Sequence, residues 1–291
     1  MTITLTAADE AGGSGLASTE YQLDGATTWT AYTAPVTVSG DGEHELRFRS
    51  TDKAGNAEAT KTVSVKIDAT APVTSATFAP ANNAGWHNGT IPVVLTSTDA
   101  GSGVKTVEWS LDGGTWTPYS TPVEVTGDGQ HELLYRSTDK AGNAETLKSA
   151  VLRIDGTKPT LLVSGIADGQ LYGDSQDIRV SWQAVDPTSG IATVVGQLDG
   201  KTYASGTLQA MYELSLGLHE VTVTATDKAG NTTTSTVRFF VTTSFRDMQG
   251  LLDRFKATGG SRPRRTSSCR TSSTLFARPR RPVTTRRRYA S

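Results

Sequence analysis

Aspartates recur at two positions of this sequence where they could hold a metal ion. One position ends a short β-rich run, and the other precedes a Gly-Asn turn. In three successive pairs these aspartates are Asp9 and Asp52, Asp99 and Asp139, and Asp186 and Asp227. If the strands beside them pack as a sandwich, both loops lie at the same end of the domain, and an asparagine carbonyl can join the two carboxylates.

Calcium is the cation that such oxygen ligands favour, but it takes about six to eight of them. The sequence offers two carboxylates and one asparagine per pair. The alternative is that each aspartate accepts hydrogen bonds from backbone N–H groups of its own loop. The shortage of ligands favours this alternative, so we expect no cofactor, with calcium as the one open choice.

The histidines are the natural place to look for a catalytic group. His44, His131 and His219 occupy the same turn of three successive segments, and His87 lies alone in a Gly-Trp-His-Asn-Gly run. A side chain copied into every segment is typical of a hydrogen-bonded turn. No nucleophile, base and orienting group converge on any histidine, so the sequence predicts no catalytic residue and no enzyme.

Two pairs of aromatic residues could contact a glycan. Trp29 and Tyr32 return as Trp116 and Tyr119. Exposed aromatic faces suit the apolar faces of sugar rings, but the same residues could anchor an edge segment against a sandwich. Packing is the more usual role of a large aromatic side chain, and the sequence favours it.

These residues recur because the chain repeats itself. Residues 23–57 return 87 or 88 positions later as residues 111–144, and a divergent third copy keeps the Thr-Asp-Lys-Ala-Gly-Asn run at 226–231. A period near 88 suits a domain that buries its own core. The predicted domains are residues 1–68, 69–155 and 156–245.

Within each copy the apolar residues alternate with polar ones, which is the pattern of a strand with one buried face. Leu46 and Phe48 show it in the first copy, and Leu133 and Tyr135 in the second. Glycines such as Gly142 supply the positive φ of tight turns. About seven short strands per copy predict a Greek-key sandwich.

The third copy departs from the others at one expected core position. Tyr21 and Trp109 stand where such sandwiches bury an aromatic, and the third copy has Gly196 there. We expect Trp182, on the preceding strand, to fill this space.

Four motifs of the second copy form a recognisable set. They are Ser-Thr-Asp-Ala-Gly-Ser-Gly-Val at 97–104, Leu-Asp-Gly-Gly-Thr-Trp-Thr-Pro-Tyr at 111–119, Gly-Asp-Gly-Gln-His at 127–131, and Arg-Ser-Thr-Asp-Lys-Ala-Gly-Asn at 136–143. This set resembles the immunoglobulin-like repeats of secreted actinobacterial and other Gram-positive proteins, including those called outer-membrane-lipoprotein-type β-barrel domains. The resemblance covers residues 1–245 and is weakest in the third copy. It implies an all-β fold of three tandem immunoglobulin-like sandwiches, used as accessory modules of sugar-processing enzymes or surface adhesins.

The joints between copies are short. The runs at 67–72 and 154–159 each end in proline, which restricts the preceding residue to extended backbone. We expect such joints to keep neighbouring sandwiches apart, as a spacer requires.

The two ends differ from the repeats. The second copy has a lead segment with a first strand at 73–78, and the first copy has no counterpart before Ile3. We therefore expect residues 1–68 to lack their opening strand, to be the least stable domain, and to have a truncated start without a signal segment.

Residues 246–259 show helical spacing of apolar residues and resemble the start of the FIMAH helical domain that can follow such repeats. Residues 260–291 hold ten arginines and the single cysteine, Cys269, without lysine or acidic residues. This segment is predicted to be disordered. It is either a basic tail for an anionic partner or, as its composition favours, an out-of-frame translation after a frameshift.

The repeats themselves are acidic, since residues 1–259 carry all 29 Asp and Glu against 18 Lys and Arg. This balance argues against nucleic acid or membrane as a partner. We therefore expect a monomeric, secreted or cell-surface spacer, attached to other domains of a longer chain that acts on carbohydrate. The alternative is a module or adhesin repeat that binds polysaccharide or cell-wall glycan itself.

Overall fold

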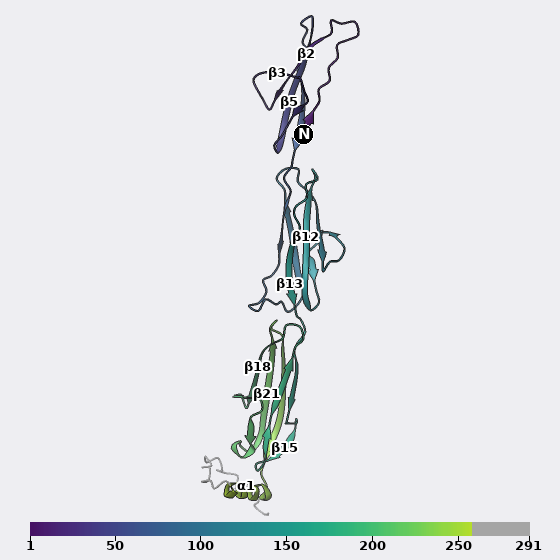
Figure 1. Ribbon diagram of the computed structural model, residues 1–291. Coiled ribbons are helices and arrows are strands. Elements are labelled where there is room, and N and C mark those ends of the chain that lie inside the picture. The colour runs from purple at the N-terminus through teal and green to yellow at the C-terminus, as the bar shows by residue number, and fades with distance from the viewer. Residues whose placement is uncertain (258–291) are drawn as a thin grey trace, which may run out of the picture. The chain divides into compact units, whose positions relative to one another are not determined.

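The computed structural model describes residues 1–257. Strands form most of this part of the chain (Figure 1). The described residues make two compact units. The first contains residues 1–165, 180–207 and 220–237, and the second contains residues 166–179, 208–219 and those from 238 onward.

The second repeat, within the first unit, is a sandwich of two antiparallel sheets. One sheet has the order β10 (Thr117–Pro118), β9 (Val104–Leu111), β12 (Gly129–Asp139) and β13 (Lys148–Ile154). The other has the order β11 (Val123–Val125), β8 (Ile91–Thr98) and β7 (Val73–Thr77). Figure 1 shows β12 and β13 side by side. The predicted number of strands and the predicted first strand are both present.

The core of this repeat lies between the two sheets. Each strand contributes alternate residues, as the burial of β8 illustrates, where Ile91, Val93 and Leu95 point inward. The cluster contains nine buried residues, with Trp109 packed against it. Period-two patterning therefore places one face of each sheet in the core.

The first repeat is built on the same plan but is smaller. Its larger sheet has the order β3 (Thr30–Ala31), β2 (Leu16–Leu23), β5 (Gly42–Asp52) and β6 (Lys61–Ile67). Opposite it, β1 (Thr2–Ile3) pairs with β4 (Val36–Thr37) in a two-stranded sheet. The buried cluster consists of Val36, Val38 and Leu46, with Tyr21 packed against it.

The first unit also holds strands that follow the second linker. β14 (Thr160–Ser164) pairs with β17 (Ser181–Val185). β18 (Ile191–Leu198) lies between β19 (Lys201–Tyr203) and β21 (Gly217–Asp227), whose first three residues belong to the second unit. A Cβ on Gly196 would lie 2.2 Å from Cη2 of Trp182. The prediction that Trp182 fills the space beside Gly196 is therefore confirmed.

The second unit combines short strands with the helix. β15 (Gln170–Gly173) runs parallel to the end of β22 (Thr232–Thr242), and β16 (Asp177–Arg179) pairs with β20 (Leu208–Ala210), which leads into the short 3₁₀ helix η1 (Met211–Glu213). Helix α1 (Phe245–Ala257) agrees with the predicted helical segment. Its first turn is capped by Ser244, whose Oγ accepts a hydrogen bond from Asp247 N at 3.2 Å.

Helix α1 is anchored by one apolar and one charged residue. Leu251 is buried, and Arg254 donates two hydrogen bonds to the Asp177 carboxylate, at 3.1 and 2.7 Å. The predictions for the arginine-rich segment 260–291 lie outside the described residues.

Candidate functional site

Both linkers are hydrogen-bonded to the repeat that precedes them. The Asp41 carboxylate accepts hydrogen bonds from Ala69 N, at 2.7 Å, and from the Thr70 hydroxyl. At the second linker, Asp128 accepts the same pair of hydrogen bonds, from Gly156 N at 2.7 Å and from the Thr157 hydroxyl. The Gly-Asp-Gly turn thus fixes the chain that leaves the repeat.

Each linker is also hydrogen-bonded to the segment that follows it. The carboxylate of Asp68 accepts a hydrogen bond from Ser102 N at 2.6 Å, and its main-chain oxygen accepts one from Asn143 Nδ2 at 3.0 Å.

The second linker repeats this arrangement. The carboxylate of Asp155 accepts from Ser189 N at 3.1 Å, and its main-chain oxygen accepts from Asn231 Nδ2 at 2.7 Å. Each linker therefore has specific hydrogen-bond partners on both sides along the chain.

The linker aspartates complete two clusters of carboxylates. Asp68 lies with Asp99 and Asp139, and in each cluster one oxygen of every carboxylate lies within 4.8 Å of the others. The second cluster consists of Asp155, Asp186 and Asp227. Four of the six aspartates singled out in the sequence therefore lie in these two clusters, two in each.

Sequence reasoning missed the third member of each cluster. Asp68 and Asp155 follow isoleucine at equivalent positions of the two linkers. This repetition was the available signal. In the first repeat, Asp9 and Asp52 belong to no such group of three among the described residues.

Most of these aspartates also bind their own loops, as the alternative interpretation predicts. Asp99 accepts a hydrogen bond from Gly103 N, and Asp139 accepts from Gly142 N and Asn143 N. Asn143 turns its amide nitrogen, not the expected carbonyl, toward Asp139, at 2.7 Å. An asparagine oxygen therefore does not add to the cluster.

In the first repeat the two aspartates act in the same local way. Asp9 accepts hydrogen bonds from Glu10 N and Gly15 N. Asn56 donates to both oxygens of Asp52 and thereby holds the pKa of that carboxyl below its usual value. Hydrogen bonds from Ser102 likewise lower the pKa of Asp68.

The repeated histidines lie in hydrogen-bonded turns. In the second repeat, His131 Nδ1 is 2.8 Å from Asp112 Oδ2, and Nε2 is 3.0 Å from the Gly127 oxygen. His44 has the same two partners in its own repeat, Asp24 and Gly40. Because both partners only accept, both ring nitrogens must donate, which favours the imidazolium form. The aspartate accordingly raises the pKa of each histidine above 6.5.

The candidate glycan-contact residues lie partly against the sandwiches. Tyr32 and Tyr119 pack against the cores of the first and second repeats. The indole of Trp29 is stacked by the Arg49 guanidinium, 4.1 Å from the ring centroid.

Trp116 has the same kind of stacking partner as Trp29. The Arg136 guanidinium lies 4.2 Å from the centroid of its ring. The side chain is 36% exposed, more than that of Trp29. The structure thus gives all four aromatic residues a packing partner.

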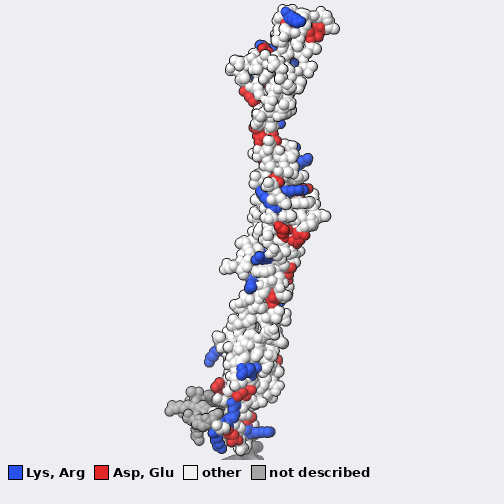
Figure 2. Space-filling model, in the orientation of Figure 1, with Lys and Arg blue, Asp and Glu red and all other residues white. Residues whose placement is uncertain are grey.

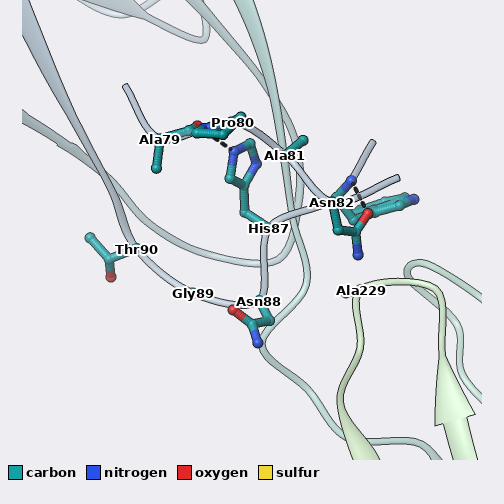
Figure 3. Close-up of a pocket in the computed structure, with 10 residues that line it drawn as sticks. Ala79, Pro80, Ala81, Asn82, His87, Asn88, Gly89, Thr90 and Ala229 are labelled. Carbon is teal, nitrogen blue, oxygen red and sulfur yellow. Dashed lines mark hydrogen bonds between the residues drawn. The ribbon is translucent and has the colours of Figure 1, made fainter. Parts of the chain in front are cut away.

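His87 lies in an open pocket of about 400 Å³ (Figure 3). Its Nε2 is 3.0 Å from the Ala79 oxygen, and its Nδ1 is 3.2 Å from the Arg153 oxygen. Asn82, on the same loop, donates a hydrogen bond to the Lys228 oxygen at 2.8 Å. The histidine therefore orders the lead-in loop of the second repeat, as expected.

Charged side chains of both signs are interspersed on the face of the molecule shown in Figure 2. They form no continuous basic band over the coloured residues of that face. Within residues 1–257, no helix has the length and apolar character needed to cross a membrane.

Comparison with known proteins gives one family match and several relatives. Residues 2–69 match the family model of the bacterial Ig-like domain. A stretch of 160 residues, 52% of this chain, is 31% identical to the serine-rich adhesin for platelets of Staphylococcus aureus strain MSSA476 and covers 7% of that protein. The adhesin of strain MRSA252 is 30% identical over 160 residues, 12% of its length.

The solved structures that match share little sequence with this chain. The fibronectin(III)-like modules of Clostridium thermocellum CbhA are 17% identical, with coverage of 58% of this chain and 95% of theirs and a TM-score of 0.31. A segment of a 1.5-MDa bacterial ice-binding adhesin is 22% identical, with coverage of 79% and 87% and a TM-score of 0.35.

The sandwich of the second repeat, its smaller counterpart in the first and the match over residues 2–69 agree with one another. The relatives that match 160 residues of the chain are adhesins. The first repeat is therefore similar to the bacterial Ig-like domain, and about half of the chain is similar to part of an adhesin.

Proposed function

We propose that this chain is a non-catalytic, extracellular accessory segment of a larger surface protein, in which the repeats act as a spacer. The observation that carries the proposal is the pair of equivalent linkers. Each is held by an aspartate of the preceding turn and by the serine N–H and asparagine side chain of the following segment. A spacer needs joints that resist bending, and short hydrogen-bonded linkers provide them.

The similarity to adhesins supports a location outside the cell. The matched region covers 7% of the length of the first adhesin, so the activity of such a chain would reside in other domains. A parent protein that acts on carbohydrate is part of this proposal.

The distance between two spin labels tests the spacer directly. Cysteines at Val63 and Val94, which are exposed on either side of the first linker, carry the labels after Cys269→Ser. A spacer predicts one narrow distance distribution, which broadens in Asp41→Ala. The matched control is Asp112→Ala, which removes a carboxylate cap inside the second repeat and leaves the distribution narrow. A broad distribution in the unmodified chain contradicts the proposal.

Glycan binding is the second candidate, and the exposure of Trp116 favours it. The indole face opposite Arg136 would be the contact surface, with Trp29 as its counterpart and Tyr32 and Tyr119 supporting the two loops. Retention on chitin, xylan or cell-wall glycan tests it. Loss of binding in Trp29→Ala and Trp116→Ala supports a glycan contact. If the unmodified chain is not retained, glycan binding is excluded.

A further inference from the structure

The cluster of Asp155, Asp186 and Asp227 is assembled from three places in the sequence. Asp155 follows β13 and opens the second linker, Asp186 follows β17, and Asp227 is the last residue of β21. One carboxylate oxygen of each residue lies within 4.8 Å of the other two. Three separate elements thus direct acidic side chains to one point.

All three carboxylates are buried. The exposed fractions are 0% for Asp155, 9% for Asp186 and 1% for Asp227. None of the three is within ion-pair distance of a lysine, arginine or histidine among the described residues. Like charges this close and this dehydrated repel strongly unless a proton or a cation compensates them.

Hydrogen bonds account for most of the carboxylate oxygens, with one exception. Oδ1 of Asp227 accepts from Gly230 N and Asn231 N, and Oδ2 accepts from Asn231 Nδ2. Oδ1 of Asp155 accepts from Thr157 N, and Oδ2 accepts from Ser189 N. These two side chains are thereby fixed in place.

The exception is Asp186. Its Oδ1 accepts from the N–H groups of Thr188, Ser189 and Gly190, which form its own turn. Its Oδ2 is shielded from water and has no hydrogen-bond partner among residues 1–257. A buried carboxylate oxygen without a partner is costly, so its persistence indicates a ligand that the protein atoms do not supply.

We propose that Asp155, Asp186 and Asp227 bind one Ca²⁺ ion, with Asp186 Oδ2 as a direct ligand. The donors are all oxygen, as a hard cation requires, and no histidine or cysteine takes part. Ligands of one calcium ion, each at about 2.4 Å from it, lie no more than about 4.8 Å apart, and these oxygens meet that limit. Bidentate carboxylates and water complete the usual shell of about six to eight oxygens.

The site ties the linker to the segment that follows it. Asp155 belongs to the linker, whereas Asp186 and Asp227 belong to loops at the ends of later strands. A bound ion therefore adds to the hydrogen bonds from Ser189 N and Asn231 Nδ2 that already hold Asp155. This inference deepens the proposed spacer function, but the ion site does not depend on it.

Calcium titration of the full chain after chelator treatment tests the proposal. We expect saturable binding with a dissociation constant of about 0.1–1 mM, the range of extracellular calcium modules. Asp186→Asn keeps the Oδ1 acceptor of the turn but removes the charge, and we expect it to lower the bound calcium by one equivalent. Asp9→Asn is the matched control, because Asp9 caps an equivalent turn without belonging to a cluster, and it leaves the number of equivalents unchanged.

Hydrogen exchange locates the bound ion and also shows whether the variant is still folded. Calcium should slow exchange in residues 186–191 and 227–231 of the unmodified chain, and not in Asp186→Asn. Asp155→Asn, in the linker, should lose the same equivalent.

Three results would overturn the proposal. They are no saturable calcium binding by the unmodified chain, an unchanged number of equivalents in both variants, and magnesium binding as tight as calcium binding. None of them depends on the spin-label result, so the ion site and the spacer can fail separately.

Discussion

The first and second repeats share a sequence pattern, yet the second is more completely built. The second repeat has β7 beside β8, and its core contains nine buried residues. In the first, β1 pairs with β4 and no second described strand lies beside it, and the core contains three buried residues. The segment ahead of a repeat is therefore part of the fold of that repeat and not only a connection.

One ion pair shows what β7 contributes. Glu145 and Lys148 are 5% and 31% exposed, whereas Glu58 and Lys61, their counterparts in the first repeat, are 34% and 60% exposed. Thr74 of β7 covers the pair in the second repeat, with its N–H donating to Glu145 and its oxygen accepting from Lys148. The same residues are thus a buried network in one repeat and a surface pair in the other.

The largest expected effect comes from the cores. Leu46 and Leu133 are equivalent and fully buried, and truncating such a leucine to alanine costs about 2–5 kcal/mol. We expect Leu46→Ala to unfold residues 1–68, because few other residues hold that core. Leu133→Ala should leave residues 69–155 folded with a lower urea midpoint. Hydrogen exchange of β5 and β12 measures both effects. Equal losses of stability would contradict the proposed difference between the two cores.

The third copy extends the comparison to a core filled in another way. In Gly196→Ala the new methyl group would meet Trp182 at 2.2 Å and the Tyr203 oxygen at 2.9 Å, so we expect a loss of about 3 kcal/mol. Gly89→Ala is the control, because no atom of the described residues lies within 4 Å of a Cβ placed there. Urea unfolding followed by tryptophan fluorescence measures the difference. A neutral Gly196→Ala would mean that Trp182 does not occupy this space.

The buried network gives the next largest effect. Glu145→Gln should cost about 2 kcal/mol, because Thr74 N and Ser137 Oγ lose a charged acceptor. Glu58→Gln should change stability by less than about 0.5 kcal/mol. Urea midpoints of the two variants test this, and similar losses would show that β7 adds nothing to the pair.

The pH dependence of this network has a definite sign. Burial raises the pKa of Glu145, but hydrogen bonds from Thr74, Lys148 and Ser137 outweigh it and hold the pKa below 4.5. The stabilisation is therefore present above pH 4.5 and is lost as the pH falls through the lowered pKa. Glu145→Gln should remove this acid dependence from the unfolding of the second repeat.

The smallest expected change in stability comes from the histidine turns, and it should be the same in both repeats. His131 and Asp112 have a raised and a lowered pKa, respectively, each through their mutual hydrogen bond. The histidine contributes stability below pH 6.5 that is lost as the pH rises through its raised pKa, and the aspartate contributes above pH 3.8. His131→Gln should lower the melting temperature by a few degrees at most near pH 5, and by less at pH 8. His44→Gln should change the melting temperature of the first repeat in the same way. A change of opposite sign would show that the two turns are not equivalent.

The sequence predicted the strands, the repeat and the helix because alternation and helical spacing are local signals. It also predicted that Trp182 compensates for Gly196, since a missing core residue must be replaced by a neighbour. The role of Asp68 and Asp155 was missed, because a linker aspartate has no local pattern and meets its partners only in the folded chain. The asparagine carbonyl was the wrong ligand, since the amide nitrogens of Asn143 and Asn231 bond the linker oxygens.

Hydrogen exchange of the linker amides tests most directly whether the two linkers are structured. Ala69 and Gly156 lie at the surface, and their N–H groups donate hydrogen bonds to Asp41 and Asp128, respectively. We predict that these amides exchange much more slowly in the unmodified chain than in Asp41→Ala and Asp128→Ala. Exchange at the rate of an unstructured peptide in all three proteins would contradict the account.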